Sequence, residues 1–240
     1  CSPERKFNRF HSFLRKVLYC RSEGIIAQTE KAKVIYKAMF QHNNIKVIGN
    51  PIRKINVRPG TLKENIVLMV GRLIETKHQD KLIGLFLNLS KTGWRLVLVG
   101  YDHLKQNNSE KLKRIISEHN AENSVILEGK QADVDSYYMR SKIFAFTSSS
   151  EGFPNVIGEA MSAGLPIVAF DCVAGPSDMI ADNVNGFLVP LFDYEQFQKK
   201  LGLLMDQPDL RDRLGKEASE NIEMFSISRI GEVYLDFILK

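Results

Sequence analysis

The 240-residue sequence is poor in cysteine, in tryptophan and in long apolar runs. Its three cysteines, Cys1, Cys20 and Cys172, have no metal-ligand spacing, which favours a reducing compartment and argues against a zinc site. Apolar runs such as 67–70 and 96–99 are too short to cross a bilayer, and the sequence carries no secretory signal. With 44% hydrophobic and 25% charged residues, the composition is that of an ordinary globular protein.

The sequence also lacks a general excess of basic residues. Its net charge of +5 arises in residues 1–21, whereas acidic and basic residues balance in the rest of the chain. This distribution argues against a nucleic-acid-binding surface. In the same segment Phe10, Leu14 and Leu18 share one helical face and Arg9 lies opposite. Such a helix suits an anionic membrane surface, and packing on an N-terminal domain of the same protein is the alternative.

Short apolar runs alternate with amphipathic stretches along the chain. Because the runs are apolar on both faces, they predict an α/β fold: a Rossmann-like parallel sheet with helices on both faces. We expect strands at 24–28, 46–48, 65–70, 95–99, 124–128, 142–146, 166–170 and 186–189. We expect helices near 29–41, 77–90, 109–120, 133–140, 155–163, 176–181, 193–206 and 208–222.

A polar stretch with two Pro-containing turns interrupts this pattern and predicts an interdomain linker at 50–64. The six strands after it suffice for a complete domain at 65–225. Residues 1–49 offer only about two strands, so we expect them to be the remnant of an incomplete N-terminal domain. Since the chain also begins with Cys rather than Met, we expect a piece of a longer protein. The apolar stripe of 226–240 predicts a helix that crosses back to the N-terminal domain.

The stretch EGFPNVIGE, residues 151–159, carries the strongest functional signal. It follows a predicted strand, and Pro154 suits the first turn of a helix, so Glu151 and Gly152 lie at the carboxyl edge of the sheet. A helix N-terminus there offers N–H groups and a dipole to an anion such as phosphate. The carboxylates of Glu151 and Glu159 can each accept two hydrogen bonds from a vicinal diol. Spacing alone leaves two interpretations open: a nucleotide-sugar pocket, or a capped helix with two solvated glutamates.

This stretch, with AMSAGLP directly after it, resembles the signature of the family-four glycosyltransferases, which are retaining enzymes of the GT-B architecture. Further elements match the family in the same order: VGRL with Lys77, the turn at 129–130, GPS at 175–177 and NGFLVP at 185–190. The resemblance covers about residue 24 to the end and mainly the C-terminal, donor-binding domain of the family. It implies transfer of a sugar from a nucleotide sugar, mostly a UDP-sugar, to a saccharide or lipid-linked acceptor that the N-terminal domain would bind.

The resemblance also implies roles for individual residues. The catalytic positions would be Arg72 and Lys77, which neutralise the donor diphosphate without a metal or other cofactor, and Glu151, which contacts the donor sugar. The alternative for the two cations is a salt bridge at a helix start. The donor-binding positions would be Gly71, Lys130, Gly152, Phe153, Pro154, Asn155, Val156 and Glu159, with Glu159 on the ribose. For Lys130 a solvated side chain is the alternative. His78 stands where the family often has Gly, which reshapes the turn but leaves both cations in place.

Other functions fit the sequence less well. The acidic pair of Asp133 and Asp135 imitates a metal-binding triplet, but its place before a predicted helix favours an N-cap. A dinucleotide oxidoreductase needs glycine-rich turns that the first predicted strand of the domain lacks. A GT-B epimerase or phosphorylase and a non-catalytic donor-binding subunit remain alternatives. From the family we expect a cytoplasmic protein, peripheral on the inner face of a membrane, in capsule or lipopolysaccharide synthesis. We expect this chain alone to bind donor without transferring sugar.

Overall fold

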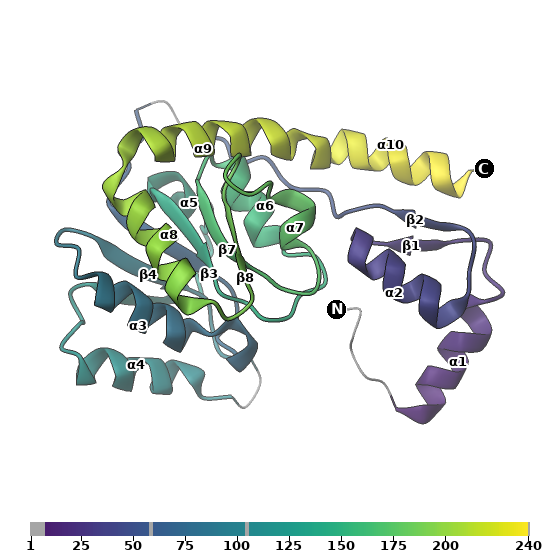
Figure 1. Cartoon of the computed structure of the whole chain (residues 1–240), viewed down its shortest axis with the longest axis horizontal. Helices are drawn as coiled ribbons and strands as arrows, with labels where there is room; N and C mark the ends of the chain where they lie inside the picture. The colour runs from purple at the N-terminus through teal and green to yellow at the C-terminus, as the bar shows by residue number, and fades with distance from the viewer. Residues whose placement is uncertain (1–7, 58–59, 104–105, 240) are drawn as a thin grey trace.

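The computed structural model describes residues 8–57, 60–103 and 106–239. Within these ranges the chain forms a six-stranded parallel sheet and a separate parallel pair, β1–β2 (Figure 1). The strands are β1 (Ile25–Ala27), β2 (Ile45–Val47), β3 (Ile66–Val70), β4 (Arg95–Val99), β5 (Val125–Gly129), β6 (Ile143–Phe146), β7 (Ile167–Asp171) and β8 (Phe187–Pro190). The large sheet has the order β5-β4-β3-β6-β7-β8, which is the Rossmann order. The order reverses between β3 and β6, where ligands of such sheets bind.

The chain forms helices around the large sheet and, in its N-terminal part, beside the β1–β2 pair. They are α1 (Arg9–Tyr19), α2 (Glu30–Phe40), α3 (Gln79–Leu89), α4 (Asn108–Glu118), α5 (Asp135–Arg140), α6 (Asn155–Ser162), α7 (Pro176–Met179), α8 (Tyr194–Asp206), α9 (Pro208–Asn221) and α10 (Ile227–Ile238), with the 3-10 turns η1 (Glu75–Lys77) and η2 (Ile222–Phe225). Strand β3 shows why both faces are covered. Ile66 and Leu68 belong to one buried cluster with residues of α5, α6 and α10, whereas Val67 and Met69 belong to a second cluster with residues of α3, α4 and α8.

Every strand and helix expected from the sequence is present, with shifted ends. The expected helix at 77–90 begins instead as η1 and α3, because His78 between them has φ +51° and interrupts the helical path. The expected helix at 176–181 is the short α7, and that at 208–222 continues into η2. The predicted α/β fold is confirmed.

The N-terminal part has a small core of its own. Strands β1 and β2 pair in parallel, and α2 packs on them through Ala32 and Phe40. Helix α1 leans on α2, where the rings of Tyr19 and Phe40 stack at 4.7 Å between centroids. A two-stranded unit of this size is too small to be stable alone, so its contacts with the rest of the chain matter.

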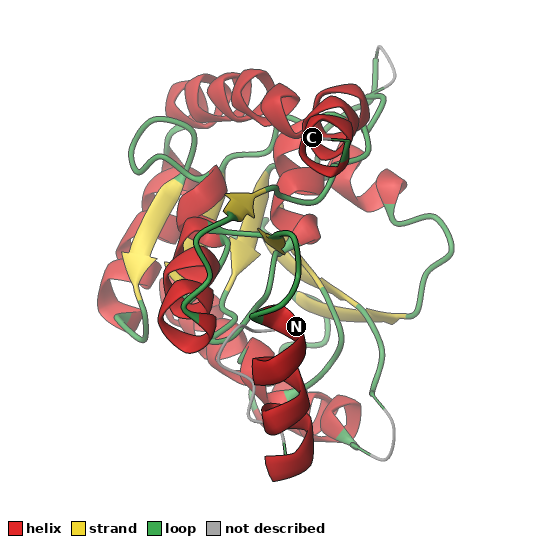
Figure 2. Cartoon of the chain, turned by 90° about the vertical axis from the view of Figure 1, so that its right-hand side faces the viewer, coloured by secondary structure: helices red, strands yellow, loops and turns green. Residues whose placement is uncertain are grey.

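Two segments connect this part to the large sheet. After β2, the N–H of Ile52 donates to the carbonyl of Phe225 in η2 at 2.7 Å. At the other end, α10 returns to β1, where a Cβ atom at Gly24 would lie 2.6 Å from the ring of Phe237. Figures 1 and 2 place α1, the β1–β2 pair and the end of α10 on the same side of the large sheet. The boundaries at 1–49, 50–64, 65–225 and 226–240 remain a prediction.

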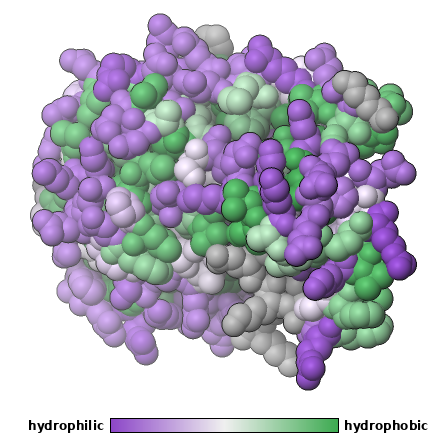
Figure 3. Space-filling view, turned by 45° about the vertical axis from the view of Figure 1, so that its right-hand side comes forward, coloured by the Kyte–Doolittle hydropathy of each residue, from purple (hydrophilic) through white to green (hydrophobic). Residues whose placement is uncertain are grey.

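This side of the molecule exposes apolar side chains among polar ones (Figure 3). In α1, Phe10, Phe13 and Leu18 are each more than 60% exposed, and near the end of α10 so are Ile238 and Leu239. In the part of the chain that the structure describes, no helix is both long and apolar enough to span a bilayer. Contact of residues 1–21 with a membrane surface remains a prediction, and residues 1–7 of that segment lie outside the described ranges.

Two helical glycines give opposite predictions for the same substitution. At Gly158 in α6 a Cβ atom would lie 2.6 Å from side-chain carbons of the buried Ile52, whereas at Gly84 in α3 no atom lies within 4 Å. We expect Gly158→Ala to lower the free energy of unfolding by about 1–3 kcal/mol through overpacking. We expect Gly84→Ala to raise it by up to about 1 kcal/mol through helix propensity. Urea denaturation measures both, and equal effects would contradict the close contact between Ile52 and α6.

Candidate functional site

The predicted site residues gather at the carboxyl edge of β3 and β6. These strands are neighbours, with Leu68 opposite Phe144 in parallel register. The loop after β3 carries Gly71 and Arg72 and enters η1, and the loop after β6 leads to α6. Because both loops leave the same edge, residues more than 70 positions apart in the sequence meet there.

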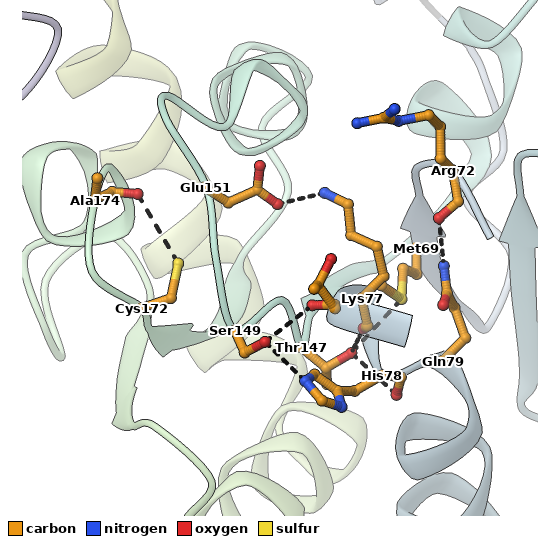
Figure 4. Close-up of polar contacts among 11 residues, drawn as sticks. Met69, Arg72, Lys77, His78, Gln79, Thr147, Ser149, Glu151, Cys172 and Ala174 are labelled. Atoms are coloured by element: carbon orange, nitrogen blue, oxygen red, sulfur yellow. Dashed lines mark hydrogen bonds and ion pairs between the residues drawn. The ribbon is translucent and has the colours of Figure 1, made fainter. Parts of the chain in front are cut away.

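The closest contact at this edge joins Lys77 and Glu151. The Lys77 ammonium forms an ion pair with Oε1 of Glu151, and the two side chains are only 11% and 16% exposed. The ammonium also lies 5.4 Å from the ring centroid of Phe146. Figure 4 shows the carboxylate and the ammonium turned toward each other between the two loops. A charge pair held away from water is strongly coupled, so removing either member leaves the other uncompensated.

Hydrogen bonds between the loops bring this pair together. The Thr147 hydroxyl donates to the carbonyl of Lys77 at 2.7 Å, and the N–H of Ser149 donates to the carbonyl of Thr76 at 2.8 Å. His78 Nε2 lies 2.9 Å from the Ser149 hydroxyl, and burial lowers the pKa of this histidine. His78 therefore adopts the left-handed backbone conformation that usually favours Gly. Its side chain holds the turn through a contact with Ser149 that a glycine could not make.

Arg72 lies beside the pair but belongs to the surface. Its side chain is exposed, and in Figure 4 its guanidinium turns to the same side as the Lys77 ammonium. Its backbone is fixed, because Nε2 of Gln79 donates to its carbonyl at 2.8 Å. Gly71 before it passes close to the next loop: a Cβ atom at Gly100 would lie 1.8 Å from the Gly71 carbonyl oxygen. Lys77 is thus buried and paired with the Glu151 carboxylate, whereas the exposed Arg72 side chain can reach a ligand.

Helix α6 begins at this edge. Pro154 lies just before its first residue, as the expected helix at 155–163 requires, and packs on Gly175, where a Cβ atom would lie 2.1 Å from the proline ring. Gly152 and the buried Phe153 precede it, and the Asn155 side chain accepts from the Asn50 amide at 2.9 Å. The N–H groups of Asn155 and Ile157 already donate to the carbonyls of Phe153 and Pro154, at 3.1 and 2.9 Å, and Pro154 has no N–H. The N–H of Val156 and the positive end of the helix dipole remain to give this edge a capacity to bind an anion.

Glu159 lies one turn further along α6 and meets a different set of residues. Its Oε1 accepts from Nε of Arg53 at 3.0 Å, and its Oε2 accepts from the hydroxyl of Tyr138 at 2.9 Å. Nη1 of Arg53 also forms an ion pair with Asp135 at 2.5 Å. Glu151 and Glu159 are therefore both engaged with cations, and neither is a solvated glutamate.

A cavity of about 350 Å³ opens at the carboxyl ends of β4 and β5. Its lining includes Gly100, Tyr101 and Gly129, and the exposed Lys130 holds its ammonium 5.5 Å from the Tyr101 ring centroid. Gly129 has φ +68°, a left-handed conformation that suits glycine. The turn at 129–130, which by resemblance to the family would lie beside the nucleotide base, is thus next to this cavity.

The two acidic residues at the start of α5 have different partners. Asp133 accepts from the N–H of Ser136 at 3.2 Å, as a helix cap does, whereas Asp135 pairs with Arg53. Among the described residues, no three side chains of the metal-ligating types come together. The absence of a metal from the reaction stays a prediction.

Sequence reasoning missed the residues that support the site. Thr147 and Ser149 stand in a run of small polar residues directly after a strand, which is a usable signal for a functional loop. Arg53 and Tyr138 had no such signal, because the contacts of Arg53 and Tyr138 with Glu159 join segments that are 106 and 21 positions away along the chain.

Comparison with known proteins identifies the family. The sequence profile of the group 1 glycosyl transferases matches residues 52–221, which is most of the chain. The chain belongs to the group 1 glycosyl transferases. It is 31% identical over 231 residues, or 92% of its length, to the amylovoran biosynthesis glycosyltransferase AmsD of Erwinia amylovora. It is 30% identical to the poly(ribitol-phosphate) alpha-N-acetylglucosaminyltransferase of Staphylococcus aureus over 89% of its length. The chain spans only 64% and 43% of these two relatives.

Solved glycosyltransferase structures share the fold. The crystal structure of a mutant of S. aureus TarM, in complex with Fondaparinux, alpha-GlcNAc-glycerol and UDP, superposes with a TM-score of 0.86 at 28% identity. The match covers 98% of this chain and 47% of that one. The Anabaena Alr3699/HepE structure in complex with UDP reaches a TM-score of 0.88 over 99% of this chain and 69% of that one, at 22% identity. The predicted GT-B fold agrees with these structures.

Breaking the Lys77–Glu151 pair should destabilise the protein. We expect Lys77→Met to lower the free energy of unfolding by about 3 kcal/mol, because it leaves a mostly buried carboxylate without its cation. Lys91→Met is the control, since its ion pair with Asp206 is far more exposed and should contribute less than about 1 kcal/mol. In urea denaturation, the double variant Lys77→Met/Glu151→Gln should recover most of the loss. Equal costs for Lys77→Met and Lys91→Met would contradict a coupled pair.

Cys172, close to Glu151, should be unreactive in the folded protein. Burial, together with the charge of Glu151, raises the pKa of the Cys172 thiol to about 11. The thiol therefore stays protonated at pH 8, where the exposed Cys20 is accessible. Iodoacetamide at pH 8 should label Cys20 in the native protein and reach Cys172 only after unfolding, as peptide mass mapping would show. Equal labelling of both thiols in the native protein would contradict the burial.

Proposed function

We propose that this chain is the donor-binding half of a retaining glycosyltransferase that uses a UDP-sugar. The observation that carries the proposal is the Lys77–Glu151 pair, which lies with Arg72 at the N-terminus of α6 in a chain of the group 1 family. This arrangement brings two cations, a helix N-terminus and a carboxylate together at the switch point of a Rossmann sheet. Each of these groups matches one part of a nucleotide diphosphate sugar.

The diphosphate would lie between Arg72 and the start of α6. Arg72 offers a planar fork to phosphate oxygens, and Lys77 offers a point charge. When the donor binds, Lys77 would share its charge between phosphate and Glu151, which frees carboxylate lone pairs for hydroxyls of the donor sugar. The N–H groups of Gly152, Phe153 and Val156 would complete the anion site.

The nucleoside would extend along the same edge of the sheet. Glu159 would accept from the ribose hydroxyls, and the base would lie near Gly129 and Lys130. UDP is the proposed nucleotide because TarM, at 28% identity, has been crystallised with UDP. The proposal leaves the identity of the sugar open.

Catalysis in this proposal is positioning and charge stabilisation. The acceptor hydroxyl would attack the anomeric carbon from the side that the diphosphate leaves, and the departing phosphate oxygen would take the acceptor proton. Arg72 and Lys77 would stabilise the charge that develops on the leaving group, with no metal required. The anomeric configuration would be retained.

The acceptor is proposed to be a saccharide or a lipid-linked saccharide. A Campylobacter jejuni relative at 27% identity is named for an acceptor on diphospho-undecaprenol, and AmsD is named for amylovoran biosynthesis. These names support a role in polysaccharide synthesis. A cytoplasmic location, peripheral on the inner face of a membrane, is a further part of the proposal. Since the chain spans 62% of the Campylobacter jejuni relative and 64% of AmsD, sugar transfer by this chain alone is not expected, and a transfer assay with UDP-sugars would test that.

Nucleotide titration tests the donor site. We expect calorimetry to detect binding of UDP in preference to GDP and ADP, unaffected by EDTA. Glu159→Ala should weaken UDP binding by about 1.5–3 kcal/mol, the scale of a hydrogen bond to a charged group. Glu122→Ala is the control, because this exposed glutamate precedes β5 and so lies at the opposite edge of the sheet. Unchanged affinity in Glu159→Ala would remove Glu159 from the ribose, and no binding of any nucleotide would contradict the donor site.

A further inference from the structure

The surroundings of Glu159 are unusually complete for a carboxylate at a ligand-binding edge. Each of its two oxygens accepts from a different side chain, Oε1 from Arg53 at 3.0 Å and Oε2 from Tyr138 at 2.9 Å. Only 18% of the Glu159 side chain is exposed. Two donors on opposite oxygens fix the plane of the carboxylate, and each oxygen keeps a further lone pair for a ligand hydroxyl.

Tyr138 is suited to act only as a donor. It is fully buried, and burial together with the charge of Glu159 raises its pKa well above the ordinary value. The hydroxyl therefore keeps its proton and directs it at Oε2. Its ring is held in the core beside Phe144, at 5.9 Å between centroids, so the donor cannot move away from α6.

Arg53 comes from the linker segment, yet its backbone is tightly placed. On one side Ile52 packs into the space above Gly158 and donates its N–H to Phe225 at 2.7 Å. On the other side the N–H of Ile55 donates to the Ser162 hydroxyl at 2.9 Å. The segment thus packs along α6 on both sides of Arg53 in the sequence, through Ile52 and Ile55. Asp135 then takes the second arm of the guanidinium at 2.5 Å and fixes its direction.

An exposed ion pair alone would not support a role for Arg53, since many such pairs contribute almost nothing to the free energy of unfolding. Here the Arg53 guanidinium is forked between two carboxylates, and Glu159 is mostly buried with its second oxygen already held. The pair therefore does more than neutralise charge: it sets the direction in which Glu159 presents its free lone pairs.

We propose that Arg53 is a positioning residue for nucleotide binding, which orients Glu159 toward the ribose hydroxyls and ties the ribose contact to the interdomain linker. This inference rests on the proposed function, in which Glu159 accepts from the ribose. Arg53 itself need not touch the nucleotide. Its effect is therefore confined to ligands that carry the ribose hydroxyls.

The test compares UDP with 2′,3′-dideoxy-UDP by calorimetry on the whole chain. Wild type should bind UDP about tenfold or more tightly than the dideoxy compound, the ratio expected for a hydrogen bond to a charged group. Arg53→Met should weaken UDP about tenfold and leave the dideoxy affinity unchanged, since the variant keeps the aliphatic stem but has no donor. Arg53→Lys keeps the charge but lacks the planar guanidinium, so it should retain part of the preference for UDP over the dideoxy compound that Arg53→Met loses. Lys54→Met is the matched control, because its neighbouring ion pair with Glu223 is largely exposed.

The outcomes separate this inference from the proposed function. Failure of wild type to bind UDP, or to distinguish UDP from the dideoxy compound, would overturn the ribose contact and the inference with it. If wild type discriminates, unchanged UDP affinity in Arg53→Met would overturn only the positioning role. Equal weakening of both ligands would reveal a merely structural residue, and tighter UDP binding would reveal a competitor for Glu159; both results contradict the proposal.

Discussion

The parallel pairing of β3 with β6 determines where Arg72, Lys77 and Glu151 can lie. These two strands are central in the sheet and adjacent in space, although the segments that follow β3 lead away to β4 and β5 before the chain returns. Their loops leave the same edge in the same direction. Thr147 and Ser149 then bind the carbonyls of Lys77 and Thr76, and only this connection places a lysine from one loop on a glutamate from the other.

The cation–carboxylate pairs have a common physical character. In both pairs the carboxylate is mostly buried, with 16% of the Glu151 side chain and 18% of the Glu159 side chain exposed; Lys77 is buried as well, whereas Arg53 is 44% exposed. Desolvated charges are costly unless their partners are fixed, so these pairs make the edge of the sheet sensitive to a charged ligand. In the proposed function, a diphosphate at this edge would meet Lys77 already oriented by Glu151.

Much of this structure could be predicted from the sequence, because the strands are apolar on both faces and the turns carry Gly and Pro. The doubly covered parallel sheet follows from residues such as Val67 and Leu68, which point into different cores. The Lys77 and Glu151 positions could be found by resemblance, but their direct contact could not. Long-range contacts such as Arg53 with Glu159 leave no periodic trace, since they depend on how a linker packs against a helix. His78 shows the converse: its departure from Gly is visible in sequence, yet the contacts with Ser149 and Phe192 that hold its turn are visible only in the fold.

The close fit of Ile52 into the space left by Gly158 has a consequence for exchanging parts between relatives. A chimera joined at the end of the linker would place a foreign side chain against the donor-domain helix, where no room exists for a larger one. A junction before residue 50 would keep the linker with its own helix. The last helix, α10, should instead be kept with the N-terminal part, because its Phe237 packs on Gly24 there. The unit of exchange is therefore discontinuous: residues 50–64 travel with the six-stranded sheet, and α10 travels with the β1–β2 part.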